Sequence, residues 1–438
     1  MNICMVGVGY VGLVSGTCFA EFGNRVICVD KDEEKIKALQ AGTIPFFEPG
    51  LEELLKRNRT AGRISFTTSL EEALNESLVV FIAVGTPSRD DGGADLSYVF
   101  DVAAEIGKFM KGYKVVVTKS TVPVGTAKKI REVIKTNQER EIPFDVVSNP
   151  EFLREGSAIE DFMRPNRVVI GSDSEQAAAI MKDLYSPLYL IETPFVLTNL
   201  ETAEMIKYAS NAFLATKISF INEMANICEL VGADVHHVAK AMGLDRRIGP
   251  KFLHPGPGFG GSCFPKDTKA IAHFASSLGY RLRIVESVIE VNERQVERIV
   301  EKMERALEGL EGKHIGILGL TFKPNTDDIR ESPAIKIVSS LLQRGARVTA
   351  YDPAGMEASK RVLKDVTYVQ SSLEVAEGAD ALAIITEWNE FRHLDWDTIR
   401  KRLNRPVVFD LRNIYEPDRM RAKGFAYYCV GRGYEPTS

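Results

Sequence analysis

The chain begins with a glycine-spaced turn that leaves few choices of fold. An apolar run, "ICMV", leads into "GVGYVG" and then into the helix-like stretch "LVSGTCFAEFG". Gly7 permits a tight turn after a strand, Gly9 lets the backbone approach a pyrophosphate, and Gly12 allows the following helix to pack closely on the strand. The helix N-terminus then faces the phosphates with its partial positive charge. This order of strand, turn and helix predicts a dinucleotide-binding unit with contacts from Gly7, Gly9, Tyr10, Val11 and Gly12.

An acidic residue after the next strand-like run indicates which dinucleotide binds. "RVICV" is followed by Asp30, 18 residues beyond Gly12, where a carboxylate can accept hydrogen bonds from both ribose hydroxyls. A carboxylate there also repels a 2′-phosphate, so the sequence favours NAD over NADP. Lys35 lies one helical turn further on and is predicted to flank the adenosine, although on its own it is better explained as a solvated helix lysine. A glycine-rich turn without a ligand is the less favoured alternative.

The rest of the chain reads as two α/β sections separated by a helical one. Apolar strand-like runs alternate with amphipathic stretches over the first 200 residues, which predicts a parallel sheet with crossover helices. Long helical periodicity follows, and a second alternating section begins at "KHIGILGL". The predicted fold is therefore α/β, with two Rossmann-like parallel-sheet domains joined by a long central helix or helical domain. The predicted domains are 1–199 for NAD, 200–310 for the helical section and 311–438 for the second α/β section.

Composition limits the class of protein. The chain has 438 residues, 45% of them hydrophobic and 26% charged, with a formal net charge of -5. This balance is ordinary for a globular protein and argues against nucleic acid as a partner. The six cysteines form neither C-x-x-C pairs nor Cys/His clusters, so we expect no disulfides, no metal site and a reducing compartment. No signal peptide or apolar run of membrane-spanning length is evident, and the predicted location is the cytoplasm.

One cysteine lies in a loop that is otherwise built of small residues. In "PGPGFGGSCFPKD", the glycines serve the backbone, whereas Cys263 precedes a helix start marked by Pro265. A thiolate is stabilised at a helix N-terminus, and Lys266 adds a further positive charge. An inert cysteine in a turn is the alternative, but the glycines, the helix start and Asp267 favour a nucleophile. A dinucleotide and a nucleophilic cysteine together can oxidise an aldehyde through a thiohemiacetal to a thioester, which water hydrolyses to an acid.

Further polar residues stand where they can serve such a reaction. Lys207 and Asn211 are four residues apart on one helix face, where a lysine and an amide can hold a developing oxyanion. "NPEFLREGSA" places Glu151 and Glu155 after a strand, and a carboxylate there can act as a base for water. Taken singly, the helix pair also fits an exposed face, and Glu155 fits a first-turn helix acid.

Two more turns are predicted at the ligand-binding edge of the first sheet. "VGTP" contains Thr86 and Pro87, and "STVPVGT" contains Ser120 and Thr121. Both turns follow strand-like runs, and ligands of open parallel sheets lie beyond the carboxyl ends of the strands. Helix capping explains each turn equally well when it is considered alone.

These motifs, together with "GLTFKPNTDDIRESPA", closely resemble the nucleotide-sugar 6-dehydrogenases of the UDP-glucose/GDP-mannose dehydrogenase family. The resemblance runs in order from Met1 to at least Arg412. It implies oxidation of the C6 alcohol of a nucleotide sugar to a carboxylate in two hydride transfers, consuming two NAD+ and one water. It also implies a covalent intermediate on the cysteine.

The resemblance further assigns roles to residues. Cys263 would capture the aldehyde, and Lys207 and Asn211 would steady the oxygen at C6. Asp267 would work with Lys207 and an ordered water, and Glu151 would serve thioester hydrolysis. The implied catalytic residues are Cys263, Lys207, Asn211, Asp267, Glu151 and Thr121.

Binding residues follow from the same resemblance. The implied cofactor contacts are Gly7, Gly9, Tyr10, Val11, Gly12, Asp30, Lys35, Thr86, Pro87, Ser120, Thr121, Glu155 and Arg330. The implied substrate contacts are Glu151, Phe152, Leu153, Lys207, Asn211, Arg247, Phe252, Gly256, Gly258, Phe259, Gly260, Phe322, Lys323 and Arg412. Arg247 would reach the site of a neighbouring subunit, which implies a homodimer. Considered singly, Lys323, Arg330 and Arg412 are better explained as surface ion pairs.

Several alternatives stay open at this point. "GGSCFPKD" fits family members that oxidise UDP-glucose to UDP-glucuronate better than the UDP-N-acetylmannosamine branch. GDP-mannose dehydrogenases carry a similar "GGSC-x-PKD" and are the closest rival. A two-electron hydroxyacid dehydrogenase and a nucleotide-sugar-binding regulator without catalysis are more distant alternatives.

Overall fold

The computed structural model describes residues 1–432, and its contacts divide the chain into two compact units. Unit 1 comprises Met1–Ser210 and His273–Gly279, and unit 2 comprises Asn211–Ala272 and the chain from Tyr280 onward. The helical section is thus shared between the units. The predicted three-domain division at 199 and 310 stays a prediction, and its last six residues lie outside the described part of the chain.

Unit 1 is built on an eight-stranded sheet with the order β3-β2-β1-β4-β5-β6-β7-β8. All neighbouring strands pair in parallel except β6 and β7, which are antiparallel. The strands are β1 Asn2–Val6, β2 Arg25–Val29, β3 Ile64–Thr67, β4 Val79–Ile82, β5 Lys114–Thr118, β6 Phe144–Ser148, β7 Val168–Ser172 and β8 Phe195–Thr198.

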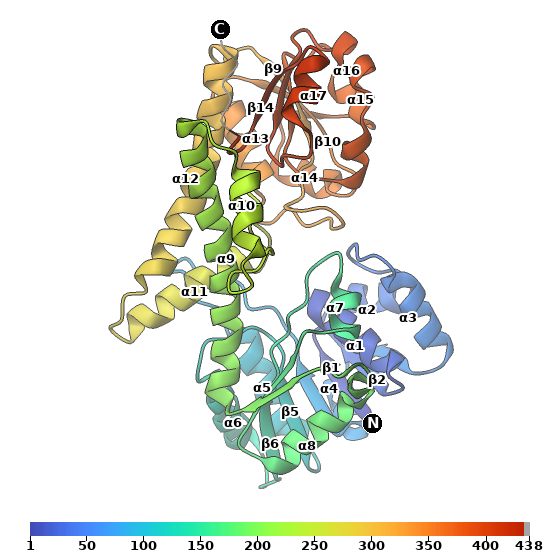
Figure 1. Ribbon diagram of the computed structural model, residues 1–438. Helices are drawn as coiled ribbons and strands as arrows, with labels where there is room; N and C mark the ends of the chain where they lie inside the picture. The colour runs from blue at the N-terminus through green and yellow to red at the C-terminus, as the bar shows by residue number, and fades with distance from the viewer. Residues whose placement is uncertain (433–438) are drawn as a thin grey trace. The chain divides into compact units, whose positions relative to one another are not determined.

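Helices cover both faces of this sheet, as Figure 1 shows. The first core cluster buries residues of α1, α3, α7 and α8 against one face, and the second buries residues of α4, α5 and α6 against the other. The helices are α1 Tyr10–Glu21, α2 Glu33–Ala41, α3 Leu51–Thr60, α4 Leu70–Glu76, α5 Ser97–Phe109, α6 Thr126–Asn137, α7 Ala158–Met163 and α8 Glu175–Leu184. This two-sided burial explains why the central strands are almost uninterrupted apolar runs.

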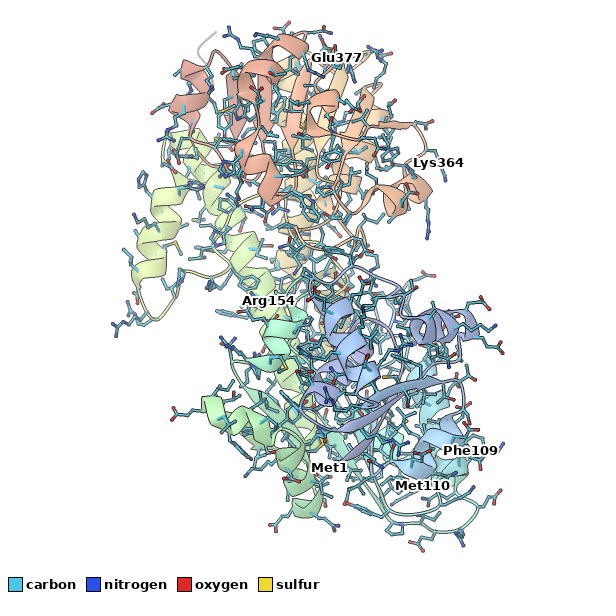
Figure 2. The ribbon with its side chains drawn as sticks, turned by 90° about the vertical axis from the view of Figure 1, so that its right-hand side faces the viewer. Met1, Phe109, Met110, Arg154, Lys364 and Glu377 are labelled. Carbon is cyan, nitrogen blue, oxygen red and sulfur yellow. The ribbon has the colours of Figure 1, made fainter. Side chains whose placement is uncertain are left out.

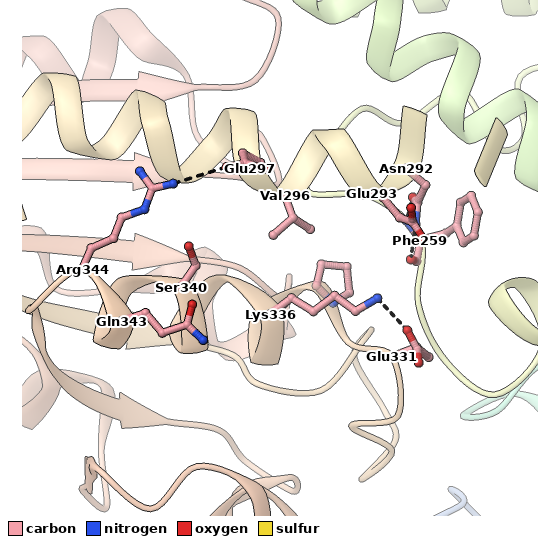
Figure 3. A pocket seen from close by; sticks show the side chains of 11 residues that line it. Phe259, Asn292, Glu293, Val296, Glu297, Glu331, Lys336, Ser340, Gln343 and Arg344 are labelled. Carbon is pink, nitrogen blue, oxygen red and sulfur yellow. Dashed lines mark hydrogen bonds and ion pairs between the residues drawn. The ribbon is translucent and has the colours of Figure 1, made fainter. Parts of the chain in front are cut away.

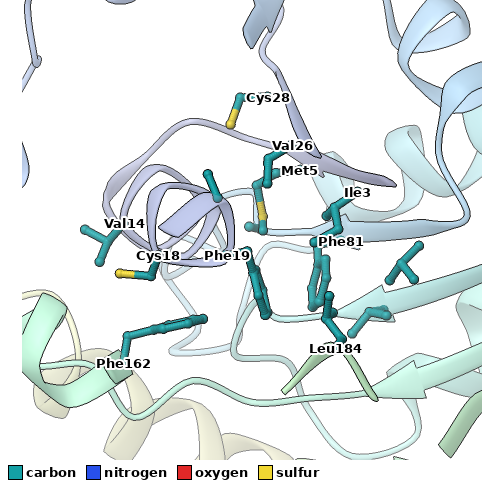
Figure 4. Packing of buried hydrophobic residues seen from close by; sticks show 14 of the residues in the cluster. Ile3, Met5, Val14, Cys18, Phe19, Val26, Cys28, Phe81, Phe162 and Leu184 are labelled. Atoms are coloured by element: carbon teal, nitrogen blue, oxygen red, sulfur yellow. The ribbon is translucent and has the colours of Figure 1, made fainter. Parts of the chain in front are cut away.

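Phe19 of α1 lies at the centre of the first core cluster (Figure 4). It is fully buried, and its ring centroid lies 5.1 Å from that of Phe81, 4.9 Å from that of Phe162 and 5.1 Å from that of Tyr185. These partners come from β4, from α7 and from the residue after α8. One aromatic side chain therefore joins the first helix to the sheet and to two later segments.

Unit 2 contains a six-stranded, wholly parallel sheet with the order β11-β10-β9-β12-β13-β14. The strands are β9 His314–Leu318, β10 Arg347–Tyr351, β11 Val366–Tyr368, β12 Ala381–Ile384, β13 Val407–Asp410 and β14 Ala426–Cys429. The helices that alternate with these strands are α13 Pro333–Gln343, α14 Met356–Val362, α15 Ser372–Val375, α16 Trp396–Arg402 and α17 Pro417–Ala422. Counted from its own first strand, the order repeats that of the first six strands of unit 1.

Asp352, directly after β10, occupies the same place in this sheet as Asp30 does in the first. It is fully buried, and both carboxylate oxygens are used within the fold. Oδ2 accepts hydrogen bonds from the Leu320 backbone and the Trp388 indole, and Oδ1 accepts from the Gly355 backbone.

Four helices make up the middle section: α9 Leu200–Val231, α10 Val235–Leu244, α11 Phe264–Ser277 and α12 Arg283–Leu307. Within unit 2, residues of α9, α10 and α12 join the core that covers one face of the second sheet. None of the helices described in residues 1–432 is both long and apolar enough to cross a membrane.

The structure confirms the predicted α/β class, the two Rossmann-like sheets and the long central helix. The antiparallel β7 is an exception to the predicted parallel pattern. The sequence reading missed several short strands, β3 and β8 among them, which lie at the two edges of the first sheet. Each is only four residues long, and β3 alternates the apolar Ile64 and Phe66 with polar residues, so neither carries a long apolar run.

We predict that Phe19→Ala lowers the free energy of unfolding by about 3–5 kcal/mol, because a buried aromatic side chain leaves a cavity between three rigid elements. Urea unfolding followed by circular dichroism measures this loss. Trp388 and Trp396, the two tryptophans of the chain, lie in unit 2, so their fluorescence supplies a separate record of that unit. A loss below about 1 kcal/mol would contradict the central role of Phe19.

Candidate active site

The glycine turn between β1 and α1 has the geometry that a dinucleotide phosphate requires. Gly7 has a left-handed backbone with φ of 97°, and a Cβ on Gly12 would lie 1.8 Å from the Gly7 carbonyl oxygen. A Cβ on Gly9, in contrast, would meet nothing within 4 Å. Gly9 is the N-cap of α1, so the open space beside it adjoins the unpaired amides of that helix.

Asp30 is hydrogen-bonded to the same turn. Its Oδ2 accepts a hydrogen bond from the Val8 backbone at 3.0 Å and lies 3.2 Å from the Lys35 ammonium. The carboxylate is thus held at the end of β2, beside the glycine turn. A carboxylate at this position fits the ribose of NAD and disfavours a 2′-phosphate.

Glu48 links the turn to the loop after β6, and the sequence reading missed it. Its carboxylate contacts the Tyr10 hydroxyl and accepts hydrogen bonds from Gly156 N at 2.6 Å and Ala158 N at 2.8 Å. Burial, followed by the hydrogen bond to Glu48, raises the pKa of the Tyr10 phenol. Glu48 stands in no recognisable motif, so only the folded chain reveals this contact.

The two predicted turns after β4 and β5 are tied to each other. The Thr86 hydroxyl donates to the Thr121 carbonyl at 3.0 Å, and the Ser120 hydroxyl donates to the Val84 carbonyl at 2.6 Å. Glu204 of α9 accepts from the Ala127 amide at 2.8 Å at the start of α6. Burial raises the pKa of Glu204 to about 7.

Glu151 and Lys207 form a buried ion pair in unit 1. Lys207 Nζ lies 3.0 Å from Glu151 Oε1, and the two side chains are only 5% and 6% exposed. The Phe152 ring centroid lies 5.4 Å from Lys207 Nζ and 3.4 Å from the Arg167 guanidinium carbon. The exposed-face alternative for Lys207 is therefore wrong.

The loop that carries Glu151 is braced along its length. The Leu153 amide donates to the Glu151 carboxylate, so the chain turns back on this side chain. Arg154, labelled in Figure 2, forms an ion pair of 2.6 Å with Asp161 of α7. Glu155 is half-buried in the same loop. Arg167 and Asp161 were missed because each lies in an ordinary polar stretch of sequence.

Unit 2 contains a second pair of predicted catalytic residues. Asn211 Nδ2 donates to Asp267 Oδ2 at 2.6 Å, and Lys266 Nζ lies 2.6 Å from Asp267 Oδ1. Asp267 is 1% exposed. Cys263 is partly exposed and directly precedes α11, where its carbonyl accepts from the Asp267 amide. The predicted helix start beside the cysteine is thus present.

Side-chain amides hold the glycine-rich loop before Cys263. Asn222 Oδ1 accepts from Gly256 N at 2.8 Å, and Gln295 Nε2 donates to Gly256 O at 2.9 Å. Asn292 accepts from Phe259 N at 2.8 Å and donates to Phe259 O at 3.1 Å. The loop therefore obtains these backbone hydrogen bonds from α9 and α12 rather than from a strand. Single amides in helices carry no sequence signal for this role.

Other predicted substrate residues gather beside this loop. A Cβ on Gly261 would lie 2.8 Å from the Phe322 ring, and one on Gly256 would lie 3.2 Å from an Arg412 guanidinium nitrogen. Arg412 donates to the Ile385 carbonyl, and the Lys323 ammonium lies 5.3 Å from the Phe322 ring centroid.

The remaining predicted residues of unit 2 differ in their surroundings. A Cβ on Gly258 would clash with Asn292 Oδ1 at 2.7 Å, and one on Gly260 would lie 2.4 Å from a backbone carbonyl. The Phe252 ring packs against that of Phe264. The Arg247 side chain is 89% exposed and pairs with its neighbour Asp245, and Arg330 pairs with Asp328. The glycines are thus enclosed, whereas the two arginines extend outward.

A cavity of about 370 Å³ lies between α12 and α13 in unit 2 (Figure 3). Its lining includes Phe259 and Asn292 but no predicted catalytic residue. Lys336 points to Glu331 and Arg344 to Glu297, so these cations are already paired with acids. The cavity thus adjoins the loop without forming part of the predicted chemistry.

The predicted residues therefore form two groups, one in each unit. Unit 1 contains the dinucleotide turn, Thr121, Glu151 and Lys207, and unit 2 contains Asn211, Asp267, Cys263 and the glycine-rich loop. Lys207 and Asn211 are one turn apart on the continuous helix α9.

Comparisons with known proteins agree on one family. Three models of the UDP-glucose/GDP-mannose dehydrogenase family match the chain: the NAD binding domain over residues 1–189, the central domain over 201–294 and the UDP binding domain over 316–417. The chain is 54% identical to the UDP-glucose 6-dehydrogenase of Rhizobium meliloti (strain 1021), over 99% of this chain and 100% of that protein.

Solved structures give the same result. A UDP-glucose dehydrogenase from the archaeon Pyrobaculum islandicum superposes with a TM-score of 0.91 at 42% identity, covering 97% of this chain and 96% of that one. A UDP-D-ManNAc dehydrogenase from Pyrococcus horikoshii gives 0.86 at 29% identity, covering 99% and 100%. The glycine turn and Asp30 fit the cofactor that the first family model names, and the chain belongs to the UDP-glucose/GDP-mannose dehydrogenase family as an NAD-dependent oxidoreductase.

Proposed function

We propose that the chain oxidises UDP-glucose to UDP-glucuronate in a four-electron reaction. The observation that carries this proposal is the 54% identity to a UDP-glucose 6-dehydrogenase over essentially the whole length of both chains. Identity to the UDP-D-ManNAc dehydrogenase is much lower, at 29%. GDP-mannose and UDP-N-acetylmannosamine are the alternative substrates.

The overall reaction balances in atoms and charge. The C6 alcohol, two NAD+ and one water give the carboxylate, two NADH and three protons. Bound NAD+ supplies hydride acceptance. The residues of the chain must therefore remove protons, hold the aldehyde between the two oxidations and activate one water.

Cys263 is proposed to hold the intermediate. Its sulfur attacks the aldehyde carbon to form a thiohemiacetal, and loss of the second hydride leaves a thioester. Its place before α11 supports this role, because a helix N-terminus stabilises a thiolate. The partly exposed side chain contrasts with the five other cysteines, which are buried.

The two buried polar pairs are proposed to manage charge and protons. Lys207 and Asn211 would stabilise the negative oxygen at C6, because an ammonium and an amide are donors that need no reorganisation once held in place. Asp267, which accepts a hydrogen bond from Asn211, would work with Lys207 and an ordered water, with Thr121 beside it. Glu151 would take the proton of the water that attacks the thioester.

The proposed binding residues form one set for the cofactor and one for the substrate. The NAD pyrophosphate would lie against the glycine turn, which comprises Gly7, Gly9, Tyr10, Val11 and Gly12, and would also contact Thr86, Pro87 and Ser120. Asp30 and Lys35 would contact the adenosine. Glu155 and Arg330 would make further cofactor contacts. The substrate would lie against Phe152, Leu153, Phe252, the loop of Gly256 to Gly260, Phe322, Lys323 and Arg412. The packing of Phe322 and Arg412 around this loop supports the second set.

A homodimer is proposed from the exposed side of α9 in unit 2. Phe213, Phe220 and Ile227 are 65%, 42% and 53% exposed, and they recur every seven residues, which places them in one stripe of the helix. A second copy of the chain would cover this stripe, and Arg247 would reach the partner's site. A cytoplasmic location is proposed because no cysteine described in residues 1–432 is in a disulfide.

Stoichiometry tests the proposed reaction. With limiting UDP-glucose and excess NAD+, we expect two NADH per sugar and no free aldehyde, measured by absorbance and by trapping with a hydrazine. GDP-mannose, UDP-N-acetylmannosamine and UDP-galactose serve as comparison substrates. One NADH per sugar would exclude the four-electron reaction, and faster turnover of another sugar would replace UDP-glucose as the substrate.

Cys263→Ser tests the covalent step. An alcohol is a poorer nucleophile and leaving group than a thiol, so we expect turnover to fall at least about 100-fold while NAD binding is retained. Mass spectrometry of the wild-type protein during turnover should detect the sugar adduct on Cys263. Cys228→Ser, at a buried cysteine, is the control and should keep its activity. Unchanged acid formation by Cys263→Ser would remove this residue from the mechanism.

Phe213→Glu combined with Phe220→Glu tests the dimer. Light scattering should give twice 48.6 kDa for the wild-type chain and 48.6 kDa for the variant, because a charge in an apolar interface is costly. Val362→Glu, a change at an exposed apolar residue on α14, should leave the mass unchanged. A wild-type mass of a single chain would contradict the proposal.

A further inference from the structure

Lys119 is a buried lysine that the proposed chemistry leaves without a role. It follows β5 directly and is only 2% exposed. Its ammonium donates to Asn149 Oδ1 at 3.1 Å and to the Tyr185 hydroxyl at 3.3 Å. Within the described part of the chain, no carboxylate forms an ion pair with it.

A charge in such a place is expensive. The rings of Phe81, Phe162 and Tyr185 surround the ammonium, with centroids at 5.9, 5.8 and 6.0 Å. Burial lowers the pKa of Lys119 to about 8, the charge of Glu151 opposes this shift, and that of Lys207 adds to it. A side chain selected for packing alone would be apolar here, because a buried charge without an ionic partner destabilises the folded state.

The local hydrogen bonds do not require a lysine either. The Tyr185 hydroxyl itself donates to Asn149 Oδ1 at 2.7 Å, so this oxygen would keep a donor without Lys119. An apolar replacement of similar length would thus leave that acceptor satisfied. Stability therefore gives no reason for the charge.

The position of Lys119 supplies a reason for its buried charge. It lies two residues before Thr121, and its partner Asn149 lies two residues before Glu151. The Asn149 amide donates to the Thr118 carbonyl of β5 at 2.9 Å, and its side chain donates to the Val169 carbonyl of β7 at 2.8 Å. Asn149 thus fixes the end of β6, from which the loop with Glu151 extends.

We propose that Lys119 is a positioning residue for Glu151. It adds a second donor, beside Tyr185, to Asn149 at the strand end that precedes Glu151, and it places a positive charge near the Glu151–Lys207 ion pair. The inference rests on the proposed function, in which Glu151 acts in thioester hydrolysis. In that step the water oxygen bonds to the thioester carbon, a proton passes to Glu151, and the carbon–sulfur bond breaks to release the Cys263 thiolate.

The proposal predicts a selective kinetic defect. Hydride transfer from the alcohol and from the thiohemiacetal does not use Glu151 as a base for water, whereas hydrolysis does. Removal of Lys119 should therefore slow hydrolysis and leave the preceding oxidations nearly unchanged. A residue needed only for folding would instead affect every step together.

The test compares Lys119→Met with wild type in stopped-flow measurements of NADH. We expect the first turnover to form up to two NADH per site at a rate within about twofold of wild type, while the steady-state rate falls about tenfold or more. Mass spectrometry should show the thioester accumulating on Cys263. Lys119→Gln keeps a donor for Asn149 without the charge, so its steady-state rate should lie between those of the other two proteins.

Lys114→Met is the matched control. Lys114 is also buried, stands at the opposite end of the same strand and donates to the Ser77 carbonyl. Burial lowers its pKa as well. This variant should keep the wild-type ratio of first-turnover rate to steady-state rate. Comparing its Tm with that of Lys119→Met separates the effect on stability from the effect on kinetics.

A double-mutant comparison completes the test. In a Glu151→Gln background, Lys119→Met should cause little further loss, since the two residues serve the same step. Equal slowing of the first turnover and the steady state, unchanged kinetics in Lys119→Met, or full additivity with Glu151→Gln would each overturn the proposal. Failure of the proposed function is distinguishable, because it appears in wild type as one NADH per sugar.

Discussion

Parallel pairing of β1, β4, β5 and β6 is the constraint on which the rest of unit 1 depends. Parallel strands direct their carboxyl ends to one edge, so the turns that follow them meet there although they are far apart in sequence. The glycine turn, the two linked turns with Thr86 and Thr121, and the loop with Glu151 all follow these strand ends. Apolar side chains on both faces hold the strands in register and leave this edge free for polar groups.

Polar side chains at this edge are buried as well as gathered. Lys207, Glu151 and Lys119 are all nearly inaccessible, and each is held by hydrogen bonds or charge. Burial raises the cost of keeping these groups charged, and the same burial strengthens their effect on a substrate because water does not screen them. The apolar core offsets that cost, with Phe19 at its centre.

Much of the fold was predictable because its signals are local. A glycine turn between a strand and a helix, followed by Asp30, indicates a dinucleotide fold without any knowledge of distant contacts. Short edge strands such as β3 and β8 were missed because four residues each are too few to form a long apolar run. The antiparallel direction of β7 likewise depends on pairing that periodicity does not encode.

The residues of the candidate site likewise include some with a local sequence signal and some without one. Cys263 and Gly12 stand in recognisable motifs, whereas Glu48, Lys119 and Asn292 act through partners distant in sequence. No spacing rule connects Glu48 with Gly156 or Lys119 with Tyr185. Such residues become visible only when the chain is folded.

The buried Asp352 has a consequence for the order of events in catalysis. Asp352 is fully buried, whereas the Asp30 side chain is 13% exposed, so Asp352 cannot meet a ribose as Asp30 can, although the second sheet repeats the strand order of the first. If two NAD+ are consumed per sugar, both must pass through the turn at Gly7. Reduced cofactor then leaves and fresh cofactor enters while the half-oxidised sugar stays behind, which makes retention of the aldehyde a kinetic necessity.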